Sequence, residues 1–463
     1  MSERPDRYVL RTVLIVSLGG FLLGFDASVI SGVVKFIEKE FALSKLEIGW
    51  AVASLTLSAT LSIVFAGPLA DRYGRRRLLR IAAVVLTASA LLSAAAHDFA
   101  TLIFARLLSG LGVGAALVVA PMYIAEIAPA AVRGRMVSFN QLHIVLGITA
   151  AFFSNYLILR LGHLDLPLLA TLRIEDWNWR WMLGIGALPS IMFFLLLFTV
   201  PESPRWLAMH GRLDVARRVL SRAHGTALAE AELAEVRSSL AHEVGKSEPR
   251  LREIWAPELR FVMMIGLIVG VLQQITGINA VFFYAPVIFE QAGASADAAF
   301  EQAVYVGLVN LVFTVIALLL IDRLGRKPLL MLGTAGIAIS MGVLAYGFSV
   351  EDGLHARLVL FGVLAFVASF AVSLGPIMWV LLSEIFPNRI RGVAISFVGL
   401  VNSAVSFGVQ LIFPWELENL GNSRPWLIYG VFAVLGLLLI WRLLPETRGK
   451  SLEELEEALV RRG

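Results

Sequence analysis

The stretch Glu126-Ile-Ala-Pro129-Ala-Ala-Val-Arg133-Gly134 returns in the second half of the chain as Glu384-Ile-Phe-Pro387-Asn-Arg-Ile-Arg391-Gly392, with the shared residues at the same internal spacing. Further pairs agree with this offset of about half the chain: Asp71-Arg72-Tyr-Gly74-Arg75-Arg76 with Asp322-Arg323-Leu-Gly325-Arg326-Lys327, and Pro201-Glu202-Ser with Pro445-Glu446-Thr. A chain of two similar halves in an apolar background predicts a membrane transporter whose substrate path follows the seam between them.

The composition supports a membrane environment. Of 463 residues, 58% are hydrophobic and 16% are charged, whereas soluble domains are nearer one half and one quarter. The net charge of +4 is small, and the arginines form short clusters between apolar runs, which is typical of membrane edges and not of a nucleic-acid surface. Without cysteine the chain has no disulfide, thiolate metal site or Cys nucleophile. The first apolar run lacks a cleavage site, so no cleavable signal peptide is expected.

Runs of about 20 apolar residues are long enough to cross a bilayer. They predict twelve spans at about 9–31, 47–70, 78–96, 101–123, 134–158, 179–200, 258–289, 300–321, 328–349, 357–383, 391–413 and 425–444. The expected fold is an all-helical membrane protein of two pseudo-symmetric six-helix bundles. The expected domains are a first bundle at 1–200, a cytoplasmic helical insert at 201–256, a second bundle at 257–449 and a cytoplasmic tail at 450–463.

Lys and Arg in the short loops set the expected orientation. The loops that hold Arg72 to Arg80, Arg133, Arg135, Arg323 to Lys327, Arg389 and Arg391 are placed inside. Both termini and the insert then lie on the cytoplasmic side of the plasma membrane, which in a bacterium is the inner membrane.

Seven motifs, in order, are similar to those of the sugar porter family of the major facilitator superfamily. The resemblance covers nearly the whole chain, from about Leu14 to Leu452. The motifs are Gly67-Pro-Leu-Ala-Asp71-Arg72-Tyr-Gly74-Arg75-Arg76, Arg106-x-x-x-Gly110-x-Gly112-x-Gly114, Tyr123-x-x-Glu126-Ile-Ala-Pro129-x-x-x-Arg133-Gly134, Pro201-Glu-Ser-Pro-Arg205, Gln273-Gln274-x-x-Gly277-Ile-Asn279, Gly375-Pro376-x-x-Trp379 and Pro445-Glu446-Thr447-Arg448-Gly449.

Asp26 lies inside the first predicted span, where an unpaired charge costs roughly 2.5–3.5 kcal/mol. Arg106 near the start of the fourth span is the matching opposite charge. Burial favours the neutral acid and the arginine favours the carboxylate, so a balanced Asp26 could exchange a proton during transport. The resemblance implies this role, because proton-coupled sugar porters have a matching Asp and Arg. The alternative is a static ion pair that locks two helices.

One position departs from some proton-coupled relatives. They have a further acid in the sixth span, where this chain has Gly186. If a second carboxylate were needed to relay the proton, the chain would lack it. Other proton-coupled relatives manage without that acid, so proton symport remains the expectation.

Neutral amides lie in the apolar spans. An amide both donates and accepts, which suits sugar hydroxyls, and Gly277 is expected to break the seventh span and open backbone to a cavity. Trp379 could stack on a pyranose ring. The alternative is amide-mediated helix packing. The predicted sugar-binding residues are Gln141, Gln273, Gln274, Asn279, Asn310, Trp379 and Asn402. Leu23 and Phe283 replace aromatic residues of many relatives, which leaves the sugar open: a hexose first, with a pentose or cyclic polyol as alternatives.

The repeated charged residues are expected at cytoplasmic helix ends. Single surface ion pairs are weak, yet a network can bias one conformation when only a few kcal/mol separate the states. The resemblance implies a gating role, and topology signalling is the alternative for the arginines. The set is Asp71, Arg72, Arg75, Glu126, Arg133, Glu202, Arg205, Asp322, Arg323, Arg326, Glu384, Arg391, Glu446 and Arg448.

The sequence favours a proton-coupled sugar importer over three alternatives. A passive facilitator would use the same site, and a sugar sensor would be expected to carry a long cytoplasmic tail, whereas this chain stops soon after Leu459. A drug antiporter is disfavoured by the amides. No Walker loop, HExxH or GxSxG motif occurs, so no enzyme and no cofactor or metal is expected. The expected partners are a neutral sugar, a proton and the lipid bilayer, without nucleic acid, for a protein that acts as a monomer.

Overall fold

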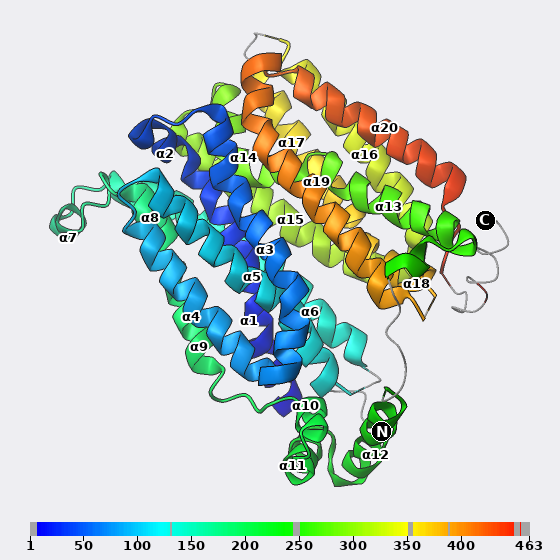
Figure 1. The fold of residues 1–463 in the computed structure, drawn as a ribbon. Helices are drawn as coiled ribbons and strands as arrows, with labels where there is room; N and C mark the ends of the chain where they lie inside the picture. The colour runs from blue at the N-terminus through cyan, green and yellow to red at the C-terminus, as the bar shows by residue number, and fades with distance from the viewer. Residues whose placement is uncertain are drawn as a thin grey trace. The chain divides into compact units, whose positions relative to one another are not determined.

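The protein is helical throughout the part that the structure describes. This computed structural model describes residues 7–129, 132–243, 251–350, 355–387, 389–448 and 454. No strand occurs in these ranges, and every regular element is a helix (Figure 1). The all-helical class expected from the sequence is confirmed. The predicted tail 450–463 lies outside the described residues except for position 454.

Twelve membrane spans are present in the described residues, as the apolar runs predict. Most spans are one long helix: α1 (Arg7–Val29), α3 (Lys45–Tyr73), α4 (Arg75–Ala94), α5 (Phe99–Ile127), α6 (Arg133–Gly162), α15 (Ala296–Leu324), α16 (Arg326–Gly347), α19 (Arg391–Leu420) and α20 (Arg424–Leu443). The others are two helices in series: α8 (Asn178–Gly184) with α9 (Ala187–Leu196), α13 (Arg260–Ile275) with α14 (Ile278–Gln291), and α17 (His355–Val372) with α18 (Leu374–Ile385).

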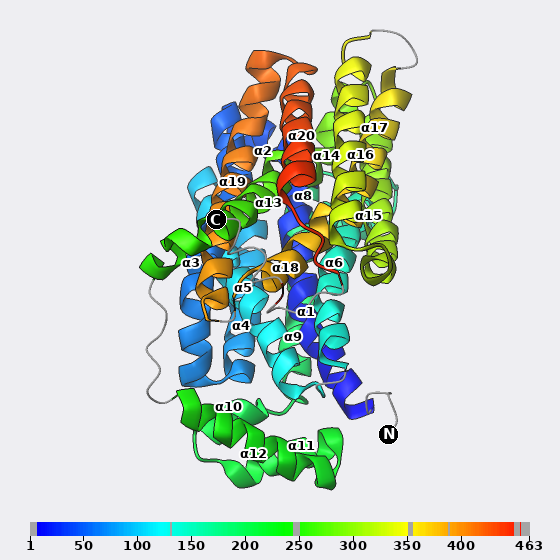
Figure 2. The same cartoon turned by 90° about the vertical axis from the view of Figure 1, so that its right-hand side faces the viewer.

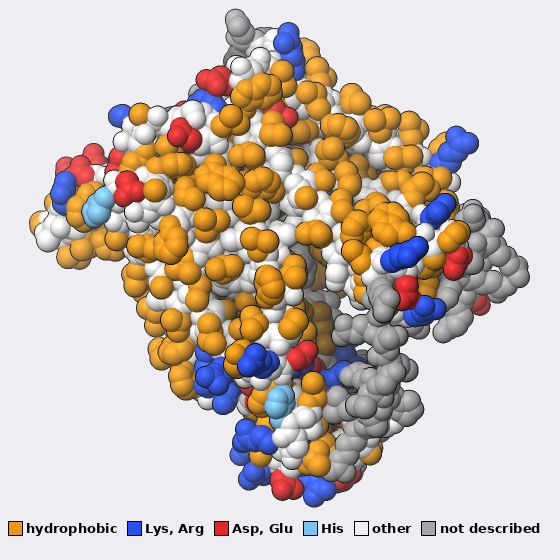
Figure 3. Space-filling view, viewed as in Figure 1, with side chains coloured by type: hydrophobic (Ala, Val, Ile, Leu, Met, Phe, Trp, Pro, Cys, Tyr) orange, Lys and Arg blue, Asp and Glu red, His pale blue; other side chains and the backbone are white. Residues whose placement is uncertain are grey.

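The surface of the spans is apolar, as a lipid-facing surface must be. Phe65, Leu319 and Ile339 are 62%, 66% and 69% exposed. Figure 3 shows hydrophobic side chains over much of one face, with the charged side chains mainly near its margins. Large exposed apolar areas are unusual on soluble monomers, so these helices face lipid.

The chain packs as two compact units. Unit 1 comprises residues 1–27, 57–151 and 177–248, and unit 2 comprises 28–56, 152–176 and 249–463. The beginning of α3 and the end of α6 therefore belong to unit 2, although they come from the first half of the sequence. The domain boundaries expected from the sequence stay a prediction.

Within each unit the helices pack side by side. In unit 1, α4 packs against α5, α8 and α9. In unit 2, α16 packs against α17 and α20, and α13 packs against α19 (Figures 1 and 2). Short elements connect the spans in unit 2: η1 (Ile30–Gly32), α2 (Val34–Phe41), α7 (Pro167–Thr171), η3 (Leu251–Trp255) and η4 (Pro257–Leu259).

The segment after the sixth span is helical, as expected for an insert. It forms α10 (Pro204–Met209), α11 (Leu213–His224) and α12 (Thr226–Glu243), which contact one another (Figure 1). Ser203 caps the beginning of α10, because its side chain accepts a hydrogen bond from the Trp206 N–H. Leu207, Leu220 and Leu233 are buried, so the insert has a small apolar core.

Candidate functional site

Asp26 and Arg106 lie together in unit 1, on α1 and α5. Arg106 Nη1 is 3.9 Å from Asp26 Oδ1 and donates to the backbone oxygen of Asp26 at 3.1 Å. The Arg106 side chain is 2% exposed and that of Asp26 is 22% exposed. The two residues that the sequence analysis pairs thus lie near one another, and their roles stay a prediction.

Ser109 completes this group and was missed in the sequence. Its hydroxyl donates to Asp26 Oδ2, while no partner is found for the buried Arg106 Nε in the described part of the chain. Ser109 follows Arg106 by three residues on α5, so both face the same side of the helix. That spacing could have indicated it. The Ser109 hydroxyl donates a hydrogen bond to the ionised carboxylate. When Asp26 is protonated, the same hydroxyl could accept a hydrogen bond from the acid.

A small cavity borders Asp26. Gly186 and Ser190 on the sixth span line it with Phe25 and Leu86, and its size suits about one water molecule. The Ser190 hydroxyl donates to the Gly186 carbonyl at 2.9 Å. No acid side chain of the described residues lines this cavity besides Asp26.

Glycines bring α1 and α6 into backbone contact beside Asp26. A Cβ at Gly24 would lie 1.9 Å from the Ile144 oxygen, and one at Gly147 would lie 2.1 Å from the Phe21 oxygen. Only glycine allows such an approach. Gln141 is half-buried on α6, so the predicted sugar ligand of unit 1 lies on the helix that packs against α1.

The seventh span breaks where the sequence predicts. Gly277, between α13 and α14, has φ +86°, a left-handed conformation that glycine adopts without strain. A Cβ there would also lie 2.6 Å from the Tyr429 ring. The break separates Gln273 and Gln274, at the end of α13, from Asn279, at the start of α14.

Four of the predicted amides form one hydrogen-bonded network in unit 2. Gln274 Nε2 donates to Gln273 Oε1 and to Asn402 Oδ1, each at 3.2 Å. Asn402 Nδ2 donates to Gln273 Oε1 at 2.9 Å, and Asn279 Nδ2 donates to Gln274 Oε1 at 2.7 Å. The network joins α13, α14 and α19, and the sugar-binding role of these residues stays a prediction.

The unused capacity of this network is mostly acceptor capacity. Gln273 Nε2 donates to the Leu374 oxygen at 2.9 Å, and Asn402 Nδ2 donates to the Gly270 oxygen at 2.8 Å. The N–H groups of the four amides are therefore largely occupied within the protein. Each amide oxygen has two lone pairs. The hydrogen bonds of the described residues use one lone pair of Gln274 Oε1 and neither lone pair of Asn279 Oδ1. The other lone pairs of these two oxygens can accept from a ligand.

Ser406 and Gln410 extend the network and were not predicted. Asn279 Nδ2 donates to Ser406 Oγ at 2.6 Å, and Gln410 Nε2 donates to the same oxygen at 2.8 Å. Both follow Asn402 at helical spacing of four and eight residues on α19, which places the three on one face. That periodicity was the available signal.

Trp379 and Asn310 form no hydrogen bond with the amide network among the described residues. Trp379, on α18, is 45% exposed and lies beside Gly399 of α19. Asn310 is buried on α15, and no hydrogen bond joins it to the four amides among the described residues. The buried Tyr284 hydroxyl donates to the Gln410 backbone oxygen at 2.9 Å, so this phenol supports α19.

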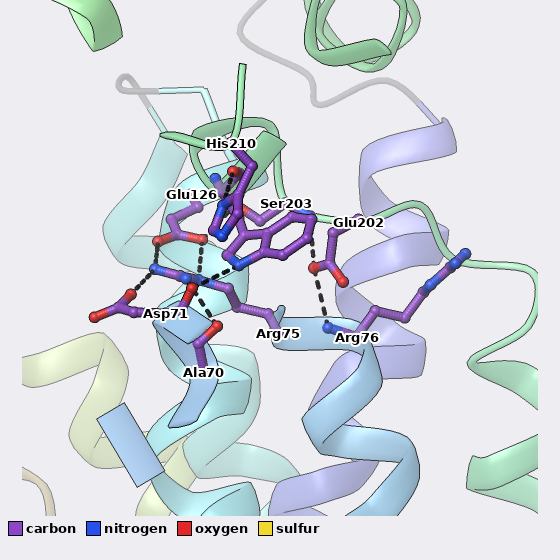
Figure 4. Close-up of polar contacts among 9 residues, drawn as sticks. Ala70, Asp71, Arg75, Arg76, Glu126, Glu202, Ser203 and His210 are labelled. Atoms are coloured by element: carbon purple, nitrogen blue, oxygen red, sulfur yellow. Dashed lines mark hydrogen bonds and ion pairs between the residues drawn. The ribbon is translucent and has the colours of Figure 1, made fainter. Parts of the chain in front are cut away.

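The first charged repeat forms a compact cluster within unit 1. Arg75 donates through Nε and Nη2 to both carboxylate oxygens of Glu126, at 3.0 and 2.8 Å. Asp71 Oδ1 lies 2.8 Å from Arg75 Nη2, and the Ser203 hydroxyl donates to Glu126 (Figure 4). A bidentate arginine–carboxylate pair is stronger than a single contact.

The second repeat builds the same cluster within unit 2. Arg326 Nη2 donates to Glu384 Oε1 at 2.7 Å, with Nε at 3.1 Å from the same oxygen. The Thr447 hydroxyl donates to Glu384 Oε2 at 2.6 Å, in the place of Ser203. The sequence repeat is thus a repeat of contacts, and Ser203 and Thr447 were visible in the third motif pair.

Glutamates cap α4 and α16 equivalently. Glu202 accepts from the Arg76 N–H at 3.0 Å (Figure 4), and Glu446 accepts from the N–H of Lys327, the equivalent position, at 3.1 Å. Burial alone would raise the pKa of Glu446, but backbone N–H donors outweigh it and lower the pKa. The glycines before these helices, at φ +96° and +93°, leave room for the carboxylates.

The remaining residues of the predicted gate have other positions and contacts. Arg391 Nε donates to the Phe386 oxygen at 3.2 Å, and Arg448 donates to the Arg323 oxygen. Arg72 lies over the Tyr73 ring, Arg133 is exposed at the start of α6, and Arg205 lies on α10. The Asp322 side chain lies outside the described residues. The ion pairs described above lie within each unit, and their gating role stays a prediction.

Comparison with known proteins gives a family match over nearly the whole chain. The model of the family described as "Sugar (and other) transporter" matches residues 12–459. The chain is 37% identical to the arabinose-proton symporter of Bacillus subtilis and 37% identical to the D-xylose-proton symporter of Escherichia coli, each over 98% of this chain and 96% of the relative. It is 36% identical to a glucose transporter of Staphylococcus epidermidis, over 99% of this chain and 98% of that one.

Solved structures agree. The xylose transporter of E. coli in a partially occluded inward open conformation has a TM-score of 0.83 at 35% identity, covering 96% of this chain and 100% of that one. The same transporter bound to 6-bromo-6-deoxy-D-glucose has a TM-score of 0.76 at 36% identity, covering 98% and 100%.

Proposed function

Because the chain belongs to the sugar porter family of the major facilitator superfamily, a family of multi-pass membrane transporters, we propose that it imports a neutral monosaccharide by symport with a proton. The protein acts as a monomer by alternating access. Asp26 takes a proton from outside, sugar binds to the amides, and Asp26 releases its proton inside. Arg106 pairs with the carboxylate during the return.

The observation that carries proton coupling is the position of Asp26. Its partly accessible carboxylate lies between the Ser109 hydroxyl, the buried Arg106 and a water-sized cavity. An ion pair that only locked two helices would be expected to make a short contact, whereas Arg106 Nη1 is 3.9 Å from Asp26 Oδ1. The membrane potential supplies about 2.3 kcal/mol per charge for each 100 mV.

The amide network supports a polyhydroxyl substrate. Gln274 and Asn279 offer uncharged oxygens to sugar hydroxyls, and Gln141 on α6 is a further proposed ligand. Relatives named for arabinose, xylose and glucose direct the choice to pentoses and hexoses, with a cyclic polyol as a third class. Trp379, Asn310 and Asn402 complete the proposed set.

The proposed location is the inner membrane of a bacterium, with both termini cytoplasmic. The clusters around Arg75 and Arg326 lie at the helix ends that the positive-inside rule assigns to the cytoplasm. They act as gates whose contacts differ between the inward-facing and outward-facing states.

Uptake by purified protein in liposomes tests the proposal. Labelled xylose, arabinose, glucose and a cyclic polyol are supplied with and without an inward proton gradient. At least one sugar should accumulate above its external concentration only with the gradient, and uptake should alkalinise the medium. Equilibration of every sugar at the same level in both conditions would contradict symport.

A passive facilitator is the second candidate, favoured by one observation. Besides Asp26, no acid side chain of the described residues lines the cavity at Gly186 and Ser190. A facilitator would exchange sugar without alkalinising the medium, so the same experiment separates the two functions.

A further inference from the structure

Gln410 occupies an unusual position for a buried amide. Its side chain is 1% exposed on α19, and both ends are bonded in different directions. Nε2 donates to Ser406 Oγ at 2.8 Å, while Oε1 accepts from the Thr56 hydroxyl of α3 at 2.9 Å. Gln410 therefore connects the amide network to a helix of the first sequence half.

The connection is continuous from the network to α3. Asn279 donates to Ser406, Ser406 accepts from Gln410, and Gln410 accepts from Thr56. The two bonds from Asn279 and Gln410 occupy both lone pairs of Ser406 Oγ, which leaves its O–H as a donor. Neighbouring hydrogen bonds polarise and orient one another, so a ligand that fixes Asn279 also fixes Gln410.

The contact between α3 and α19 at this point is close. A Cβ at Gly49 would lie 2.0 Å from the Leu411 oxygen, and the rings of Trp50 and Phe407 meet edge-to-face at 6.0 Å. All of these residues belong to unit 2. In an alternating-access cycle this contact must open when the outer path opens, because it joins segments from the two sequence halves.

We propose that Gln410 and Thr56 are positioning residues that couple sugar binding to closure of the contact between α3 and α19. The proposal rests on the proposed function. Sugar held by Gln274 and Asn279 orients Ser406 and Gln410, and the oriented Gln410 oxygen holds Thr56. Neither Gln410 nor Thr56 needs to touch the sugar.

Because the chain has no cysteine, a single introduced cysteine can report whether a contact between the two sequence halves is open. Ser31, on η1, is 2% exposed, and η1 packs against α14. This is a second contact between the two sequence halves. The near-isosteric Ser31→Cys introduces the only thiol of the chain at this contact. A membrane-impermeant maleimide added to cells should label this introduced thiol only when this side opens. Sugar should slow labelling in the otherwise unchanged protein.

Thr56→Val removes the hydroxyl and keeps the side-chain shape. In the Ser31→Cys background, the variant should leave sugar affinity within roughly twofold, lower turnover roughly three- to tenfold, as for loss of one hydrogen bond, and raise thiol labelling without sugar by a similar factor. Protection by sugar should weaken. Thr56→Ser should restore all three readouts. Gln410→Leu, which also releases Ser406, should weaken affinity as well.

Thr87→Val is the matched control, because the Thr87 hydroxyl donates to the Ala83 oxygen of its own helix. It should behave as the parent. Thr56→Val with parent-like turnover, labelling and sugar protection would overturn the proposal. If no sugar is transported, the proposed function fails, while labelling without sugar still tests the link between Thr56 and Gln410.

Discussion

At the scale of single residues, Asp26 is the group to which we assign proton coupling. A charge inside a membrane costs several kcal/mol unless it is paired, hydrated or neutralised. Asp26 has a hydroxyl donor, a nearby guanidinium and a cavity of about one water. Each of the two protonation states is therefore supported by its surroundings, as a proton carrier requires.

Asp26→Asn should abolish accumulation and spare exchange. The amide keeps the size of the side chain and a hydrogen bond with Ser109 but cannot bind or release a proton. Internal sugar should then not exceed external sugar under a proton gradient, while counterflow stays within a few-fold of the parent. Asp98→Asn, at the N-cap of α5 where Asn serves equally well, is the control. Gradient-driven accumulation by Asp26→Asn would refute the proton role.

The oxygens of Gln274 and Asn279 lead to a prediction about the sugar. Since the N–H groups of the amide network are largely occupied, sugar hydroxyls should bind mainly as donors. Replacing a recognised hydroxyl by fluorine should then weaken apparent affinity about as much as its removal, roughly three- to tenfold per lost donor. A panel of deoxy and fluoro sugars in competition uptake measures this. Fluoro sugars that bind like the parent would show that the amides donate instead.

At the scale of helices, close contact of α1 with α6 depends on glycine. Gly24→Ala would place a Cβ 1.9 Å from the Ile144 oxygen. The helices must separate, at a cost of roughly 1–3 kcal/mol, so the thermal midpoint of the purified protein should fall and transport should weaken. Gly408→Ala, with open space around its Cβ, should be neutral or stabilising by up to about 1 kcal/mol. Equal midpoints for Gly24→Ala and the parent would contradict the close contact.

The capped start of α16 gives a pH prediction. The pKa of Glu446 is lowered from its ordinary 4.5, so its stabilisation is complete above that value and is lost as pH falls through the lower folded pKa. The thermal midpoint of the parent should therefore fall below about pH 4.5 more steeply than that of Glu446→Gln, which carries no titrating group there. Parallel pH profiles would contradict the role of the cap. Glu418→Gln, exposed on α19, is the control.

The sequence predicted the helical elements better than the small hydroxyl groups. Spans follow from run length, and amides such as Gln274 stand out in apolar helices. Hydroxyls do not, because Ser and Thr in membrane helices commonly bond their own helix, as Ser17 does to the Val13 oxygen. The helical spacing of Ser109 from Arg106 and of Ser406 from Asn402 was therefore only a weak signal, and the structure was needed to identify their contacts. The grouping of the start of α3 with unit 2 could not be predicted either, since it depends on packing between distant segments.

At the scale of the whole molecule, the internal repeat has a structural meaning. Arg75, Glu126 and Ser203 in unit 1 reproduce the contacts of Arg326, Glu384 and Thr447 in unit 2. Each cluster ties the beginning of one helix to the end of another inside its own unit. In this state the clusters hold together helices of one sequence half, whereas alternating access also requires changes where segments of the two sequence halves meet.

One such place within unit 2 holds ion pairs. Lys35 Nζ of α2 lies 2.6 Å from Glu290 Oε2 of α14, and Arg160 Nη1 lies 3.4 Å from Asp297 Oδ2. Exposed ion pairs contribute about 0–1 kcal/mol each, yet even 1 kcal/mol changes the ratio of two conformations about fivefold. These pairs are therefore expected to set the balance between states more than the stability of the fold.

Reversing one charge and then both tests this expectation. In the Ser31→Cys background, Lys35→Glu places two carboxylates together, so the contact should open more often, thiol labelling should rise, and turnover should change because the closed state is less populated. Lys35→Glu combined with Glu290→Lys restores opposite charges and should return labelling towards the parent, and high salt should reduce the difference because it screens exposed charges. Lys39→Glu, exposed on the same helix, changes the net charge equally and should have little effect. Labelling that rises in Lys35→Glu and stays as high in the double variant would show that the pair does not hold the contact closed.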